Sequence, residues 1–284
     1  MFKMPMLFHL RVLVNKGLLY EEVWFILTAL VATCFLVACS GSQGVSPKTI
    51  KEKKKIVVAT ESEFAPFEFK SLVNGKDTLV GADIELAKAI GEKLGVKVEF
   101  SVMSFDNVLA NVQSGKADIA IAGISVTDER KKVYDFSDSY YTSENVVIVK
   151  KDKVNDYTST DSLAKQTVGT QKGSVQETVA KKQIPKASVV SLASNGEMIN
   201  ELKSGQLQAV VLEKAIAEGY IAQNDDLTLA NFNLKSDGTD AYAVATRKGS
   251  DDLLKEINAV IKETKDSGKF DQWLKEASTY KQSK

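Results

Sequence analysis

The feature that most restricts the fold of this chain is a regular alternation of short β-branched segments with segments of helical period, which occurs twice. The first series begins at Lys55 and reads "KIVVAT", "ADIELAKAIGEKLG", "VKVEFSV", "FDNVLANVQSGK" and "ADIAIAG". The second reads "TVGTQ", a helical segment from about Val175, "ASVVSLA", "GEMINELKSG", "LQAVVLE", "AIAEGYIAQ" and "AYAVATRKG". Strand, helix and strand in this order indicate sheets covered by helices, so the sequence predicts two successive α/β units.

The helix predicted from about Asp83 to Leu94 illustrates the helical period. Its apolar residues recur three and four positions apart, while charged residues occupy most of the other side. The apolar positions are Ile84, Leu86, Ala87, Ile90 and Leu94. This pattern is typical of a helix that covers a sheet, and it does not indicate a binding site.

Two extended segments, residues 144–151 and 241–247, are predicted to carry the chain between two lobes. A final helical pair within "DDLLKEINAVIKETKDSGKFDQWLKEA" would then return to the first lobe. The predicted division is residues 55–145 plus 247–284 for lobe 1 and residues 146–246 for lobe 2. Two connections between lobes form a hinge, whereas one would form a tether.

The N-terminal region has the pattern of a secretion signal. Residues 23–38 form an apolar run of the length of a signal sequence core, and Leu36-Val37-Ala38-Cys39 resembles the bacterial lipobox. We therefore predict a lipoprotein signal peptide over 1–38, lipidation of Cys39, and a flexible tether over 39–54. The alternative is a short transmembrane anchor with an incidental cysteine.

Loss of this leader would remove several kinds of chemistry. The only histidine, His9, and one of the two cysteines, Cys34, both lie within it. Catalysis by histidine or a thiolate, Cys/His zinc sites and disulfides are then excluded from residues 40–284, and we predict no metal and no cofactor. The whole chain carries 37 basic and 37 acidic residues, which does not indicate binding to nucleic acid.

Polar and aromatic residues follow the predicted strands. Because ligands of open α/β sheets bind outside the carboxyl ends of the strands, these residues are the candidates for a site. They are Glu61 and Phe64 after the first strand, "AGISVTDER" (122–130) after the third, "QKGSVQE" (171–177) in the second unit, and Glu213 after "LQAVVL".

Within "AGISVTDER", Thr127 is a suitable N-cap and Arg130 can hold a carboxylate through two hydrogen bonds. The loop before it leaves backbone N–H groups near Gly123 and Ser125 to face an anion. The alternative is that Arg130 only pairs with a surface acid such as Asp128 or Asp135.

In the second unit, Ser174 and Glu177 have the spacing of a capping box, and Gly173 would let a ligand approach the backbone. Glu213 suits an ammonium group, although it could be an ordinary acid at the start of a helix. Phe67 is predicted in the core, and Phe64 in the cleft beside Glu61. A ligand with a carboxylate, an ammonium group and a side chain on an aromatic face is an amino acid.

These residues resemble the polar amino-acid solute-binding proteins of bacterial ABC importers, which have the type II periplasmic-binding-protein fold. The likeness runs from about Lys55 to Lys275. It rests on "FAPFEF", "VGADIELAKAIGEKLG", "SFDNVLANVQSGKADIAIAGISVTDERKKVYDFSDSYY" and "SGKFDQWLKEA". The resemblance implies two mixed α/β sheets, helices over them, and a two-stranded hinge.

The resemblance also implies roles for individual residues. Arg130 would bind the ligand carboxylate with help from the 122–125 loop (Ala122, Gly123, Ser125) and from Gly173 and Ser174. Glu213 would bind the ammonium group, and Phe64 and Phe105 would enclose the side chain with Glu61 at its end. Gln171 tolerates a cationic or a neutral side chain. Glu61 and Glu213 stand where the family commonly has aspartate.

The predicted function is therefore the substrate-binding subunit of an amino-acid ABC importer, which binds arginine or lysine by hinge closure. Its partners would be a free amino acid and a membrane permease with its ATPase, and the protein would be a lipid-anchored monomer on the outer face of the cell membrane. The alternatives are a glutamine or cystine binder, an enzyme such as a dehydratase or transglycosylase on the same fold, and a sensor or adhesion lipoprotein.

Overall fold

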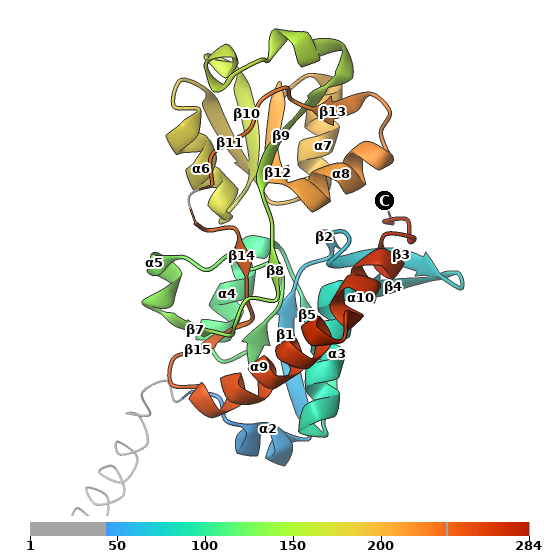
Figure 1. Cartoon of the computed structure of the whole chain (residues 1–284), viewed down its shortest axis with the longest axis vertical. Helices are drawn as coiled ribbons and strands as arrows, with labels where there is room; N and C mark the ends of the chain where they lie inside the picture. The colour runs from blue at the N-terminus through green and yellow to red at the C-terminus, as the bar shows by residue number, and fades with distance from the viewer. Residues whose placement is uncertain (1–43, 237, 284) are drawn as a thin grey trace, which may run out of the picture. The chain divides into compact units, whose positions relative to one another are not determined.

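Two five-stranded mixed sheets organise the computed structural model, which describes residues 44–236 and 238–283 (Figure 1). The strands of the first sheet, in spatial order, are β5 (Lys97–Val102), β1 (Lys55–Thr60), β6 (Ile119–Ala120), β15 (Ala245–Arg247) and β7 (Tyr134–Phe136). In this sheet β1 runs parallel to β5 and β6, whereas β15 runs antiparallel to β6 and β7.

The second sheet repeats this arrangement. Its strands, in spatial order, are β11 (Ser188–Leu192), β10 (Thr167–Gln171), β12 (Ala209–Glu213), β9 (Asn145–Lys150) and β13 (Leu227–Leu229). Here β10 runs parallel to β11 and β12, and β9 runs antiparallel to β12 and β13. Each sheet thus contains a parallel core of three strands, whose carboxyl ends lie at one edge.

Helices follow the strands and cover the sheets. They are α3 (Ala82–Leu94), α4 (Phe105–Gln113), α5 (Asp128–Lys131), α6 (Val175–Gln183), α7 (Asn195–Ser204), α8 (Lys214–Ala222), α9 (Asp251–Asp266) and α10 (Lys269–Ala277). The last two pack against α3, so the chain ends on the first unit (Figure 1). The predicted fold class, two mixed sheets covered by helices, is confirmed.

The smaller elements lie at the margins of the two units. A hairpin sheet contains β2 (Glu63–Phe64), β3 (Glu68–Val73) and β4 (Lys76–Val80). Two 3-10 helices, η1 (Lys151–Asp156) and η2 (Thr160–Leu163), lead from β9 to β10. In the described ranges, no helix is long and apolar enough to cross a membrane.

The connections between the sheets differ in position from the prediction. They pair as a short ladder of β8 (Tyr141–Thr142) and β14 (Ala241–Tyr242). The segment predicted as the first connection, 144–151, contains β9, which lies inside the second sheet because its apolar residues are buried. The second predicted connection, 241–247, includes β15 of the first sheet, so the first unit resumes before residue 247.

Part of the predicted flexible tether is a helix. Helix α2 (Pro47–Lys53) begins at a capping box formed by Ser46 and Thr49. Ile50 is fully buried, and the backbone N–H of Val45 donates to Ser250 Oγ at 2.8 Å. The tether prediction is therefore wrong over this range, because a capped turn with an apolar face docks on the first unit. Residues 39–43 with Cys39, and the predicted signal peptide with His9 and Cys34, lie outside the described residues.

The docking of α2 can be tested by truncating its buried side chain. We expect Ile50→Ala to lower the free energy of unfolding by about 2–5 kcal/mol, the usual effect of removing a buried isoleucine. The neighbouring exposed Glu52→Ala should change it by less than about 0.5 kcal/mol. Urea unfolding monitored by circular dichroism measures both values. Equal, small effects would show that α2 does not contribute to the fold.

Candidate functional site

The first parallel strand of each sheet, β1 and β10, leads to a polar residue, and the two residues meet. Gln171 at the end of β10 donates from Nε2 to Glu61 Oε2 at 2.9 Å, just after the end of β1. Both side chains are buried, and Glu61 Oε1 finds no partner among the described residues. Burial, with smaller contributions from the nearby Glu63 and Glu213, raises the pKa of Glu61 to about 8, although the hydrogen bond from Gln171 opposes the shift.

The loop after β6 carries the predicted residues Ala122, Gly123 and Ser125, all of them buried. Gly123 has a φ of 54°, and a Cβ at this position would lie 2.5 Å from the ring of Phe64. Glycine therefore allows both the turn and the aromatic ring above it. The backbone N–H of Gly123 donates to Asp83 Oδ2 at 3.1 Å.

Arg130 joins this loop to the second unit. The N-cap prediction for Thr127 is confirmed, because its Oγ1 accepts from the backbone N–H of Arg130 at 3.1 Å. The guanidinium donates to Ser125 O at 2.7 Å and to Gly173 O at 3.1 Å, and its Cζ lies 5.9 Å from the centroid of the Phe105 ring. Burial lowers the pKa of Arg130 to about 10, so it remains a cation at neutral pH.

The turn after β10 differs from the predicted capping box. Ser174 Oγ donates to Gln171 O at 2.7 Å and accepts no hydrogen bond from the first turn of α6, as the box would require. Glu177 Oε2 accepts instead from the N–H of Gly173, one residue earlier, at 3.3 Å. Ser174 remains the N-cap residue of α6 by backbone conformation, but its side chain does not cap.

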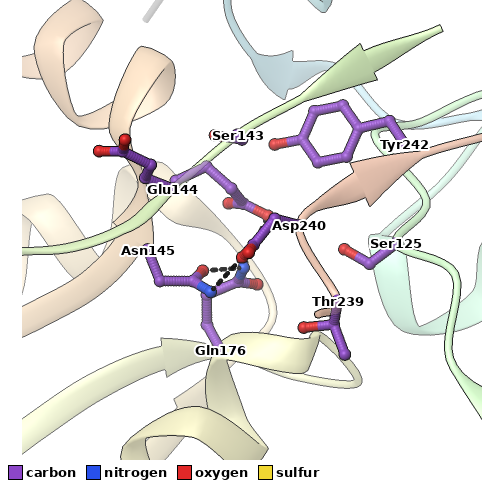
Figure 2. A pocket seen from close by; sticks show the side chains of 9 residues that line it. Ser125, Ser143, Glu144, Asn145, Gln176, Thr239, Asp240 and Tyr242 are labelled. Carbon is purple, nitrogen blue, oxygen red and sulfur yellow. Dashed lines mark hydrogen bonds between the residues drawn. The ribbon is translucent and has the colours of Figure 1, made fainter. Parts of the chain in front are cut away.

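Glu213 closes the other end of the site, where β12 meets α8. Gln176 Nε2 donates to Glu213 Oε1 at 2.7 Å and to Asn145 Oδ1 at 2.7 Å. Burial raises the pKa of Glu213 to about 7, against the positive charge of Arg130. Figure 2 shows the adjoining crevice, in which Asn145, Gln176 and Asp240 point toward one another.

The structure therefore brings most of the predicted residues together, either in direct hydrogen bonds or as charged neighbours. The aromatic pair is the exception, because Phe64 packs with Phe67 and Tyr242 whereas Phe105 belongs to a separate hydrophobic cluster. Phe67 is fully buried, as predicted for a core aromatic.

Several residues of the site region were missed by the sequence interpretation. They are Asp83, Asn145, Gln176, Asp240 and Tyr242. Asp83 lies in the first turn of the predicted sheet-covering helix. An acidic residue is ordinary at that position, so the sequence gives no signal of its burial. The others lie within strands, helices or loops whose local patterns carry no such signal.

A second group of contacts joins the two units outside this site. Glu63 Oε2 accepts from Gly196 N at 3.0 Å and from Ser194 Oγ, both at the start of α7. Lys172 Nζ lies 2.8 Å from Asp106 Oδ2. The hydroxyl of Tyr220 donates to Glu63 O at 3.3 Å.

Residues 56–277 match the family model described as bacterial extracellular solute-binding proteins, family 3. The chain belongs to this family. This membership agrees with the position of the site at the carboxyl ends of both parallel cores.

Known relatives of this solute-binding protein include arginine binders. A crystal structure of the substrate-binding protein AbpA from Streptococcus pneumoniae Canada MDR_19A, bound to L-arginine, is 51% identical with a TM-score of 0.79, over 81% of this chain and 97% of that one. The arginine-binding extracellular protein ArtP of Bacillus subtilis is 35% identical, over 89% of this chain and 96% of its own. The glutamine-binding protein GlnH of the same species is 32% identical, over 88% and 96%.

The raised pKa values predict a pH dependence of stability without ligand. Glu61 and Glu213 hold protons in the folded protein that their unfolded forms release above about pH 4.5. Their stabilising contribution is complete below that pH and is lost as the pH rises through about 7 and about 8. We therefore expect the free energy of unfolding to fall between pH 5 and 8, by up to about 1.4 kcal/mol per pH unit for each group.

Urea unfolding of the ligand-free protein at several pH values measures this slope. Glu61→Gln should reduce it, whereas Glu92→Gln on the exposed side of α3 should leave it unchanged. A stability that is flat or rises over this range would contradict the assignment of buried, protonated acids to the site.

Proposed function

We propose that this chain is the substrate-binding subunit of an amino-acid ABC importer and that its ligand is L-arginine. The observation that carries the proposal is the set of charges at the site: one half-buried cation, Arg130, with two buried acids, Glu61 and Glu213. Arginine carries the complementary set of one carboxylate and two cationic groups. The L-arginine complex of the pneumococcal relative supports the same ligand.

Arg130 is proposed to bind the ligand carboxylate. One of its nitrogens donates to the carbonyl oxygen of Ser125 in the same unit, which orients the guanidinium, and the other donates to that of Gly173 in the second unit. The backbone N–H groups of the 122–125 loop other than that of Gly123, which donates to Asp83, and the hydroxyl of Ser174 are proposed to complete this end of the site. Glu213, held by Gln176, is proposed to bind the ammonium group.

Glu61 is proposed to bind the guanidinium of the ligand. The free Oε1 can accept from it, while Gln171 holds Oε2. Phe64 and Phe105 supply aromatic surface, and stacking of a cation on an aromatic ring contributes roughly 0.5–2 kcal/mol. Because a cation favours the ionised form of Glu61, binding at pH 7 is expected to release a proton.

Glutamine is the second candidate ligand. Its side-chain amide is the group that Gln171 already presents to Glu61 in this structure, so a neutral amide can satisfy this carboxyl group. The glutamine-binding relative supports this alternative.

Ligand binding is proposed to stabilise a closed arrangement of two lobes, hinged near the β8/β14 ladder. The lobes correspond to the two sheets with their helices. The protein would then present its closed form to a membrane permease and its ATPase. We further propose that it acts as a monomer, that lipid on Cys39 anchors it at the membrane, and that it is a binding protein and not an enzyme.

A ligand screen by thermal shift tests the proposed substrate. We expect arginine to give the largest shift among the amino acids and cystine, since ligand at 100 times its Kd adds about 2.7 kcal/mol of stability. Arg130→Ala should raise the Kd for arginine by about a hundredfold or more, through loss of a charge-assisted pair. Calorimetry measures these values.

Glu61→Gln separates arginine from glutamine. The variant should weaken arginine binding by about tenfold or more while changing the Kd for glutamine little, because only arginine loses a charge pair. Glu92→Gln is the matched control. A shift only with glutamine would refute arginine as the ligand, and no shift with any amino acid would favour the enzyme or adhesion alternatives.

The contacts of Glu63 with the start of α7 test hinge closure. If they form only in the closed state, Glu63→Ala should raise the Kd several-fold, with a faster dissociation rate and an unchanged order of preferred amino acids. The exposed Glu197→Ala in the same helix turn is the control. Stopped-flow fluorescence and calorimetry measure these quantities, and an unaltered Kd and dissociation rate would argue against a role of this contact in closure.

A further inference from the structure

Two carboxyl groups are buried together behind the Gly123 loop. Glu68 on β3 and Asp83 in the first turn of α3 are both 0% exposed. Asp83 Oδ2 accepts from Gly123 N at 3.1 Å and from the hydroxyl of Tyr140 at 2.8 Å. Asp83 Oδ1 and both oxygens of Glu68 find no donor in the part of the chain that the structure describes.

The two carboxyl groups lie within hydrogen-bonding reach of each other. Ionised carboxylates only accept hydrogen bonds, so a bond between them requires a proton on one of the two. Without it, two adjacent negative charges would be buried away from water, which is highly unfavourable. The geometry and the burial together therefore require a shared proton.

The surroundings assign this proton to Glu68. Asp83 receives donors from Gly123 and Tyr140, which stabilise its anion, whereas Glu68 receives none. The charged groups that act on Glu68 are Asp83, Glu61 and Glu213, all acidic. Burial and these charges raise the pKa of Glu68 well above its ordinary value, while burial raises that of Asp83 only to about 6.

We propose that Glu68 is a protonated acid that donates to Asp83, and that this pair positions the backbone of Gly123 in the binding site. Glu68 holds one oxygen of Asp83, which leaves the other directed at the N–H of Gly123. Asp83 is also fixed through its own backbone N–H, which donates to Phe67 O at 2.9 Å. Both residues are positioning residues, and their effect on affinity rests on the proposed function of the Gly123 loop.

The shared proton is tested without ligand by infrared spectroscopy. At about pH 7, we expect the C=O stretching band of protonated carboxylic acids to lose intensity in Glu68→Gln. Hydrogen exchange at the Gly123 amide, measured by NMR, should stay slow in Glu68→Gln, whose amide still donates to Asp83, and become faster in Glu68→Leu.

Arginine binding tests the positioning. Glu68→Gln should keep the Kd within about twofold, and Glu68→Leu, of similar volume, should raise it about tenfold. If the leucine variant does not fold, Tyr140→Phe, which removes one donor to Asp83, should accelerate exchange at Gly123. A band unaffected by Glu68→Gln would overturn the protonated Glu68, and equal affinities of the glutamine and leucine variants would overturn the positioning role.

The two proposals fail in different ways. A wild-type protein that binds no amino acid would refute the proposed function. The infrared band and the Gly123 exchange rate refer to the ligand-free protein, so they still decide whether the acid pair exists and holds the loop.

Discussion

One half-buried guanidinium beside several buried carboxyl groups is the interaction on which the rest of this site depends. Arg130 donates to carbonyl oxygens of both units. Its positive charge opposes the rise in the pKa of Glu213 that burial causes. The neutral amides of Gln171 and Gln176 donate to Glu61 and Glu213, and burial keeps the pKa values of both acids near or above neutrality. A site of this kind is short of positive charge, which the proposed ligand, a dicationic amino acid, would supply.

Under the proposed function, the same contacts would couple the ligand to the arrangement of the two units. Gln171 and Gly173 come from the second sheet, whereas Glu61 and Arg130 come from the first. A ligand that engages these residues would join the units through them. Glu63 and Lys172 add contacts beyond the site, which lets the stability of the joined form vary independently of ligand recognition.

Buried contacts hold the Gly123 loop behind the polar groups of the site. Gly123 is held from below by Asp83 and covered from above by Phe64, so its backbone N–H direction is constrained on both sides. Buried polar groups of this type contribute to specificity when every donor and acceptor is satisfied. In this interpretation, Glu68 completes the set by carrying a proton where an anion would be unfavourable.

The sequence by itself determined the alternation of strands and helices, the two units, and the residues at strand ends, because these depend on local periodicity and on short motifs such as "AGISVTDER". Only the tertiary structure decided that 145–150 is a buried strand, that α2 docks, and that Ser174 bonds Gln171 in place of capping. It also decided the partners of Asp83, Gln176 and Glu61. Those pairings join residues 31 to 110 positions apart, and no local pattern encodes which distant side chains will share a buried space.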